Sequence, residues 1–417
     1  MILSTALALS LVSIVFPTAI DASRTIPLTK RDTGITQADG SVNLSAIKQE
    51  TSRLFSKYQR NTNAVTANKA ARRTQGGVQQ LSKRGSVPLT IQEQAIWTGS
   101  VTIGTPAQNF DIYFDTGSSD FTVASTTCGS SCGSKDRYNV AASSTANRTS
   151  TTVTTNFVDG TSSSGQLVYD TVSAGMLTAK SQAVIAASSL SSSVSQIPSD
   201  GMGLAYPALS QAYSSSFQFT LTNEGVGNVP YFGLRLSNTP GVSALTFSGY
   251  ARNKITGSIR FFNVAKDDSS TTFNTYWQIA ASAPFVNGAQ AISQRVNHIL
   301  DSGTTLIIAP QAAASQFYAK IPGSQVYDTG VWTFPCNSTP TVEFSFARIT
   351  LQKYKINPDD FNLGYTTEDP TQCVGAVMGA NLGIGSSWIL GDTFILSWYI
   401  VHDVARGRIG LVAPRST

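Results

Sequence analysis

The chain has 417 residues, of which 41% are hydrophobic and only 13% are charged. It is too apolar for a disordered protein, and it is long enough to form two hydrophobic cores. The formal net charge of +5 hides an asymmetry, because residues 23–84 carry +9 and residues 85–417 carry −3.

The N-terminus begins with an apolar run, Ile2–Phe16, which is too short to span a membrane and is followed by the small residues Ala19 and Ala22. This pattern predicts a secretory signal peptide over residues 1–22. No later stretch is long and apolar enough to cross a membrane, and the last residues lack the pattern of a lipid anchor. We therefore expect a secreted, extracellular protein without a membrane anchor.

Residues 23–84, called the leader below, contain twelve Lys or Arg against three Asp or Glu. A basic run of this kind can be a solvated tail or a nucleic-acid-binding arm. A secreted chain has little use for nucleic acid, and Lys83-Arg84 before Gly85 has the form of a dibasic processing site. We favour a removable pro-segment that charge holds to an acidic cleft, and no nucleic-acid partner.

The rest of the chain is predicted to be mainly β. Short runs rich in Val, Ile, Phe, Tyr and Thr recur between Gly, Asn and Ser, as at Val101–Gly104 and Ile259–Phe262. Helical periodicity is confined to a few segments. The clearest are Leu44–Arg60 in the leader and Gln311–Ala319, which follows a proline at a plausible helix start.

A short motif occurs twice, as Phe114–Ser118 (Phe-Asp-Thr-Gly-Ser) and as Leu300–Thr305 (Leu-Asp-Ser-Gly-Thr-Thr). Each copy has an apolar strand, then an Asp, a small hydroxyl residue, Gly and a second hydroxyl residue. A single copy would be ordinary turn chemistry. Two copies, with Asp115 and Asp301 placed 186 positions apart, indicate a duplicated unit that contributes one carboxylate from each half.

Four cysteines in a secreted chain suggest two disulfides. Three pairings are possible, and proximity in the sequence favours Cys128–Cys132 and Cys336–Cys373. The two histidines, His298 and His402, lie far apart in the sequence and are expected to be packing residues. We therefore expect no zinc site, no Ser-His-Asp triad and no cofactor.

Two glycosylation acceptor triplets lie in the mature region, Asn147–Thr149 and Asn337–Thr339. They make Asn147 and Asn337 candidate glycosylation sites in a secreted protein.

Over residues 85–417 the chain resembles the pepsin-like aspartic proteases, and in its processing layout it is similar to the secreted fungal members. Besides the two Asp motifs, five further segments carry the resemblance: Gly99–Gln108, Asp200–Pro207, Phe334–Asn337, Trp388–Phe394 and Arg408–Pro414.

The resemblance implies a mainly β, bilobal fold with an active-site cleft between two homologous lobes. We expect the N-terminal lobe over residues 85–255 and the C-terminal lobe over residues 256–417. In each lobe the Asp loop should cross beneath an apolar-apolar-Gly segment. That segment is Ile389–Gly391 in the second lobe. In the first it is Gly201–Gly203, which departs from the family pattern at Gly201.

The resemblance also implies the chemistry. Two neighbouring carboxylates cannot both ionise cheaply, so Asp115 and Asp301 should share a proton. One then serves as the base for a water molecule and the other as the acid for the substrate carbonyl, which is the known behaviour of aspartic protease dyads.

Flanking residues should support this dyad. The first hydroxyl of each motif is expected to hydrogen-bond across to the opposite loop, the second to bind the outer carboxylate oxygen, and the glycine to leave room for their approach. These residues are Thr116, Ser118 and Gly117 in the first motif, and Ser302, Thr304 and Gly303 in the second.

A hairpin over residues 156–165 is expected to cover the cleft as a flap, with Phe157, Asp159 and Gly160 near the substrate. Family members have Tyr where Phe157 stands, and Trp in the strand position where Thr122 stands. Both polar groups that would anchor the flap are therefore absent from this sequence.

These features together predict an aspartic endopeptidase, made as a zymogen, that cleaves proteins or peptides at acid pH, is sensitive to pepstatin and is monomeric. Family leaders often carry Lys-Tyr, which makes Lys57 a candidate to reach both aspartates. The alternative is a peptide-binding or inhibitor protein on the same scaffold, although such proteins usually lose an Asp or a flanking hydroxyl. A two-carboxylate glycosidase fits less well, because it would not explain the matching hydroxyl-flanked turns.

Overall fold

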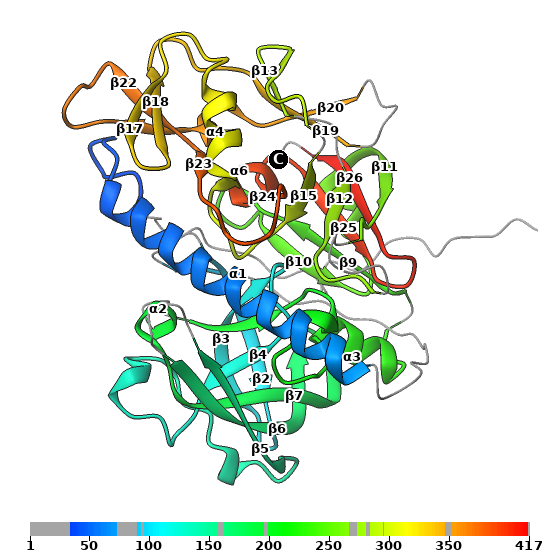
Figure 1. The fold of residues 1–417 in the computed structure, drawn as a ribbon. Helices are drawn as coiled ribbons and strands as arrows, with labels where there is room; N and C mark the ends of the chain where they lie inside the picture. Colours follow the sequence, from blue (N-terminus) through cyan, green and yellow to red (C-terminus); the bar gives the residue numbers. More distant parts are fainter. Residues whose placement is uncertain are drawn as a thin grey trace, which may run out of the picture.

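The computed structural model describes residues 34–72, 90–92, 96–156, 162–195, 199–227, 229–266, 273–280, 284–294, 296–346 and 352–415. These residues form mostly β-strands. They are arranged in two lobes, and the long helix α1 (Leu44–Arg72) lies diagonally across the line between the lobes (Figure 1). The mainly β, bilobal fold predicted from the sequence is confirmed.

The lower lobe in Figure 1 is built on one eight-stranded sheet with the order β1-β2-β3-β8-β4-β7-β6-β5. Its strands are β1 (Thr90–Gln92), β2 (Ile96–Ile103), β3 (Gln108–Asp115), β4 (Phe121–Ala124), β5 (Asn147–Asn156), β6 (Ser162–Ala174), β7 (Leu177–Ser189) and β8 (Asp200–Gly203). In β3, Phe110, Ile112 and Phe114 are buried at every second position, as expected for a strand with one face on the core. This strand ends at Asp115.

The upper lobe contains three smaller sheets, with the orders β12-β15-β24-β16-β23, β14-β13-β19-β20 and β17-β18-β22-β21. Their strands are β12 (Gln278–Ala280), β13 (Phe285–Val286), β14 (Ala289–Gln290), β15 (Asn297–Leu300), β16 (Ile307–Ala309), β17 (Gln325–Asp328), β18 (Val331–Pro335), β19 (Val342–Ser345), β20 (Lys353–Lys355), β21 (Asn362–Tyr365), β22 (Gln372–Gly375), β23 (Val377–Gly379) and β24 (Trp388–Leu390). Strand β15 ends directly before Asp301, as β3 ends at Asp115.

A fifth sheet, β10-β9-β25-β26-β11, joins segments that are distant in the sequence. Its strands are β9 (Tyr231–Arg235), β10 (Ala244–Phe247), β11 (Ile255–Asn263), β25 (Tyr399–Asp403) and β26 (Arg408–Pro414). Strands β9 and β25 are direct neighbours although they are far apart in the sequence, at residues 231–235 and 399–403. The expected lobe boundary between residues 255 and 256 falls at the start of β11, and the division of the chain into lobes at that point stays a prediction.

The shorter helices are α2 (Ser192–Ser195), α3 (Phe217–Asn223), α4 (Gln311–Tyr318), α5 (Pro358–Phe361) and α6 (Asp392–Ile395). Helix α4 matches the expected segment closely. Helix α1 also begins where the pattern predicts but continues beyond Arg60 to Arg72, because Ala64, Val65 and Asn68 prolong its buried face.

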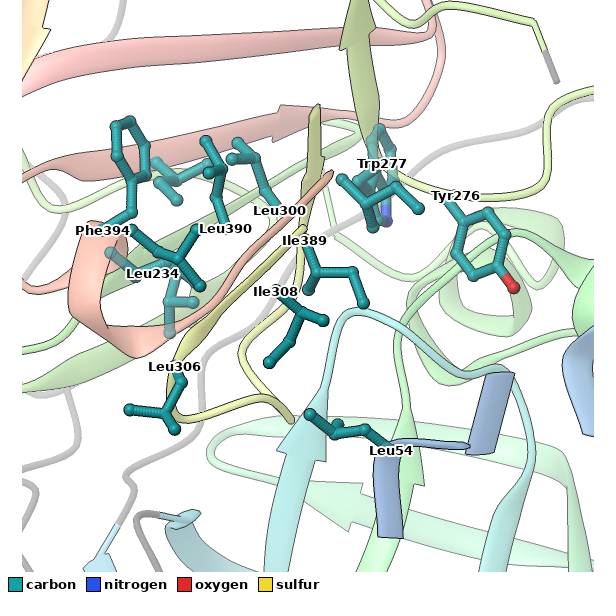
Figure 2. Close-up of a cluster of buried hydrophobic side chains, with 14 of the residues drawn as sticks. Leu54, Leu234, Tyr276, Trp277, Leu300, Leu306, Ile308, Ile389, Leu390 and Phe394 are labelled. Atoms are coloured by element: carbon teal, nitrogen blue, oxygen red, sulfur yellow. The ribbon is translucent and has the colours of Figure 1, made fainter. Parts of the chain in front are cut away.

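Helix α1 packs on both lobes through one stripe of residues. Ile47, Leu54, Tyr58 and Val65 are all buried, at spacings of seven, four and seven that return to the same side of a helix. They belong to the main hydrophobic core cluster. Figure 2 shows Leu54 at the edge of that cluster, which also contains upper-lobe side chains such as Ile308. The helix is therefore integrated into the core.

The structure contains two disulfides, Cys128–Cys132 and Cys336–Cys373, with S–S distances of 1.96 and 2.03 Å. This is the pairing favoured by proximity in the sequence. Among the described residues, no helix has the length and apolar character needed to span a membrane. The same part of the chain contains no cluster of three His, Cys, Asp or Glu residues that could hold a metal ion.

Candidate active site

The two aspartates occupy equivalent places in the two lobes. Strand β3 runs parallel to β8, with Asp115 opposite Gly203, and β15 runs parallel to β24, with Leu300 opposite Leu390. In each lobe the strand that follows the Asp loop, β4 or β16, pairs antiparallel with that same neighbour. The loop must therefore pass close to the neighbouring strand, and a Cβ on Gly203 or Gly391 would overlap the backbone near it.

The two Asp loops are tied together by four crossed hydrogen bonds. Thr116 Oγ1 donates to the carbonyl of Leu300 (2.9 Å) and accepts from the amide of Ser302 (2.9 Å). Ser302 Oγ mirrors this arrangement, donating to the carbonyl of Phe114 (2.9 Å) and accepting from the amide of Thr116 (3.2 Å). All of these groups are buried, so the two loops are held in a fixed relation across the lobe boundary.

Two donors from its own loop orient the Asp115 carboxylate. The amide of Gly117 donates to Oδ1 (2.8 Å) and Ser118 Oγ donates to Oδ2 (2.5 Å). A Cβ on Gly117 would lie 2.5 Å from the carboxyl carbon of Asp301. Glycine is therefore required at residue 117, because the opposite carboxylate occupies the space of a side chain.

The Asp301 carboxylate has the same arrangement. The amide of Gly303 donates to Oδ1 (2.9 Å) and Thr304 Oγ1 donates to Oδ2 (2.5 Å). A Cβ on Gly303 would overlap the carboxylate of Asp115. The structure thus brings together every dyad-supporting residue expected from the sequence.

Lys57 of helix α1 lies between the two carboxylates. Its Nζ is 2.7 Å from Asp115 Oδ1, and 2.9 and 2.8 Å from the two oxygens of Asp301. The side chain is 3% exposed and the carboxylates no more than 2%. The leader thus places a buried cation on the dyad, as the sequence suggested for Lys57.

The environment separates the pKa values of the two aspartates. Burial raises the pKa of Asp115; Lys57 opposes this rise, and the negative charge of Asp301 adds to it. For Asp301, burial is again the largest single influence, but the Lys57 charge and hydrogen bonds from Asp115, Lys57 and Thr304 outweigh it, so its pKa is lowered. With the leader in place, Asp115 is the member of the pair that protonates first on acidification.

Three further leader residues contact the dyad or its loops. Tyr58 OH donates to Asp301 Oδ2 (2.8 Å), Arg53 Nη2 donates to the carbonyl of Gly303 (2.6 Å) and Asn61 Nδ2 donates to the carbonyl of Gly117 (2.7 Å). The sequence analysis did not anticipate these three contacts. A signal was present in the spacing, because Arg53, Lys57 and Asn61 recur every four residues, which brings them to one side of a helix.

The departure from the family pattern at Gly201 has a physical cause in the preceding strand. Gly201 lies opposite Tyr113 in the β3–β8 pairing, and a Cβ on Gly201 would overlap the ring of Tyr113. The tyrosine ring therefore occupies the space that an apolar side chain at residue 201 would need.

The structure does not describe five of the predicted site residues. The flap residues Phe157, Asp159 and Gly160 and the processing pair Lys83 and Arg84 lie outside the described residues.

Asn147, in β5, and Asn337, beside a disulfide cysteine, are both exposed, so the two glycosylation acceptors are accessible. Glycosylation at either asparagine stays a prediction.

Both histidines are fully buried among aromatic rings. His298 is surrounded by Phe344, Phe346 and Trp388, and His402 stacks on Phe232 with ring centroids 4.0 Å apart. Neither imidazole belongs to the dyad.

Comparison with known proteins agrees with this geometry. The family model described as "Eukaryotic aspartyl protease" matches residues 96–414. The chain belongs to this family. Its members are aspartic-type endopeptidases, and this chain is one of them.

Curated relatives span most of the chain. It is 38% identical over 341 residues to an aspartic protease of Phaffia rhodozyma, covering 79% of this chain and 80% of the relative. It is 29% identical over 334 residues to cathepsin D of Dictyostelium discoideum (78% and 85% covered), and 30% identical over 334 residues to pepsin A of Sus scrofa (78% and 83%). The resemblance read from the sequence motifs is thereby confirmed.

Proposed function

We propose that this aspartyl protease is a secreted endopeptidase, made as a zymogen, that hydrolyses internal peptide bonds of proteins at acid pH. The observation that carries the proposal is the matched pair of buried carboxylates, Asp115 and Asp301, each oriented by a glycine amide and a hydroxyl and both in contact with one ammonium. The apolar N-terminal run and the accessible glycosylation acceptors support secretion.

The position of the Lys57 ammonium indicates how the dyad would act when the leader is absent. A water molecule in that position would be within hydrogen-bonding distance of both carboxylates. The ionised carboxylate would take a proton from the water as it attacks the peptide carbonyl. The protonated partner would donate its proton to the carbonyl oxygen, which leaves a gem-diol and exchanges the roles of the two carboxylates. When the C–N bond then breaks, the newly protonated carboxylate would give its proton to the leaving nitrogen and the other would take a proton from a gem-diol hydroxyl, which restores the starting state.

We propose that the leader keeps the enzyme inactive by occupying this place. Lys57 neutralises the dyad, while Arg53 and Asn61 bind the carbonyl oxygens of Gly303 and Gly117. Helix α1 also buries Leu54 and Tyr58 in the core, so a substrate has to displace packed apolar surface as well as a cation.

Acidification would weaken this inhibition in steps. Lys57 lowers the pKa of both aspartates relative to a dyad without the leader, so protonation of either one weakens leader binding. Asp115 protonates first, because burial keeps its pKa above the ordinary value. Ionised Asp301 stabilises the leader-bound state at pH values above the ordinary pKa of an aspartate. Because its pKa is lowered, this stabilisation is lost gradually as the pH falls below that ordinary value. Cleavage at Lys83-Arg84 by a kexin-type protease is the competing route to activation and needs no acid.

The test is to purify the full chain at neutral pH, with Lys83 and Arg84 both changed to Ala, and then acidify it. We expect conversion to a mature-sized enzyme that hydrolyses a protein substrate and is inhibited by pepstatin. A leader that stays attached and inhibitory at acid pH would leave dibasic cleavage as the activating step. If the mature chain binds pepstatin but does not hydrolyse any peptide, the chain is a peptide-binding protein instead.

A further inference from the structure

A pocket in the lower lobe opens directly beside the dyad. Among the described residues, its lining includes Tyr113, Ser118, Asp120, Thr122 and Asp200, together with Arg60 of helix α1. Ser118 also donates the hydrogen bond to Asp115, so the pocket lies within one side chain of a reacting carboxylate. A substrate that displaces the leader would present a side chain to the same walls.

Tyr113 and Gly201, which lie opposite each other on β3 and β8, form one wall of the pocket. Glycine at residue 201 leaves room for the ring of Tyr113, and both residues line the pocket, so this wall is aromatic. Such a surface, next to a carboxylate, suits a guanidinium or an ammonium, because a cation is attracted to the face of an aromatic ring.

The pocket also contains a second carboxylate, Asp120, which forms no ion pair with the lobe's Lys or Arg residues in the part of the chain that the structure describes. Asp200 is paired with Lys135, whose Nζ lies 3.7 Å from Asp200 Oδ1 and 2.8 Å from the carbonyl of Ser199. Asp120 instead accepts hydrogen bonds from neutral donors, which are Ser210 Oγ (2.6 Å) and the amides of Gln211 (2.8 Å) and Ala212 (3.3 Å).

Arg60 of the leader supplies the positive charge that acts on Asp120 in this structure. It lines the pocket with Asp120 and is close enough to lower the pKa of both Asp120 and Tyr113, although burial raises each of them overall. The carbonyl of Arg60 also accepts a hydrogen bond from Gln211 Nε2 (2.8 Å), which fixes this turn of the helix over the pocket. When the leader leaves, Lys135 stays beside Asp200 on the pocket wall, and Asp120 loses the charge of Arg60.

We propose that this pocket then binds a basic side chain of the substrate, lysine or arginine, next to the scissile bond. Asp120 is the counter-charge, Tyr113 is the aromatic wall, and the substrate side chain replaces Arg60. The inference rests on the proposed endopeptidase activity and assigns it a substrate class.

The experiment uses the mature enzyme and peptides that differ at one residue, scanned over three positions on each side of the cleaved bond. Arginine is compared with citrulline, which has nearly the same shape without the charge, and with leucine. The highest pH with measurable turnover is used, because burial raises the pKa of Asp120 and the carboxylate must be ionised. At one position we expect kcat/KM to fall roughly 10-fold or more from arginine to citrulline, as for loss of a charged hydrogen bond.

Asp120→Asn should remove this discrimination while the citrulline peptide is still cleaved. The matched control is Asp136→Asn, which removes an exposed carboxylate of the same lobe that does not line the pocket, and it should keep the discrimination. The arginine–citrulline comparison on the unaltered enzyme does not depend on the folding of any variant.

Equal cleavage of the arginine and citrulline peptides at every position would overturn the inference. Discrimination that persists in a folded Asp120→Asn enzyme would overturn the assignment of Asp120. Failure to hydrolyse any peptide would instead count against the proposed function, so the two failures are distinguishable.

Discussion

Arg53 Nη2 lies 2.6 Å from the carbonyl oxygen of Gly303, beside the second aspartate. Asn61 makes the corresponding contact with Gly117, beside the first. The leader thus caps one carbonyl on each side of the dyad, with Lys57 between them. Glu50 holds Arg53 through two hydrogen bonds (2.7 and 2.8 Å), so the contact at Gly303 is a small buried ion-pair network.

Arg53→Ala should therefore weaken the binding of the leader to the lobes more than the loss of a surface ion pair would. The substitution leaves the Glu50 carboxylate buried without its cation. We expect the leader to be released at a higher pH than in the parent chain. The control is Lys48→Ala, since Lys48 is 55% exposed and its pair with Asp328 should contribute little. Equal release pH for the two variants would contradict the role given to Arg53.

Lys57→Met should leave the uncleaved chain partly active. The methionine keeps the length of the side chain but removes the cation, so the dyad can share a proton beneath a more weakly held helix. Pepstatin binding and peptide hydrolysis by the unprocessed chain should both rise, whereas Lys57→Arg should stay closer to the parent. A Lys57→Met chain as inactive as the parent at mildly acid pH would show that apolar packing of α1 alone is inhibitory.

Asp115→Asn and Asp301→Asn should each reduce turnover by about 10²–10⁴-fold or more, because one carboxylate cannot act as acid and base together. Folding should be retained, since the asparagine oxygen can accept from the glycine amide while its NH2 group donates to the hydroxyl oxygen. Circular dichroism and melting temperature provide the control. A variant with more than about a tenth of the parent turnover would contradict the dyad assignment.

Gly201→Ala should destabilise the lower lobe by about 1–3 kcal/mol, because the added methyl overlaps the Tyr113 ring. The change should also lower activity, since Tyr113 lies two residues before Asp115 on β3. Tyr113→Leu in the same chain should recover much of the lost stability by removing the overlap. Denaturant unfolding of the single and double variants measures the coupling, and additive effects would show that residues 113 and 201 do not interact.

His298→Phe should increase stability at acid pH. Burial lowers the pKa of His298 to about 3, from an ordinary value near 6.5. Between these values the unfolded chain binds a proton that the folded histidine does not, so stability falls as the pH drops through this window, by up to about 5 kcal/mol. The gain from phenylalanine, measured as a difference in melting temperature, should grow from neutral to acid pH. A constant difference would contradict this explanation.

The active site was predictable largely because its chemistry is local. Asp115 and Asp301 each sit at a strand end, followed by hydroxyl and glycine residues, and the repetition of that pattern distinguishes it from an ordinary turn. The leader was less predictable. Its charge excess and Lys57 were evident in the sequence. The spacing of Arg53 and Asn61 indicates only that they share a helix face with Lys57, because the backbone carbonyls that they bind have no signature in the residue types.

The sequence by itself determined the mainly β class, the two carboxylate loops and the segment that carries Lys57, because strand periodicity, turn chemistry and charge are properties of neighbouring residues. Only the tertiary structure decided that Tyr113 takes the space above Gly201, and that Arg60 and Asp120 share one pocket. These relations join residues that are distant in the chain. They depend on which side chains compete for the same volume, and that is settled only when the sheets and helix α1 pack together.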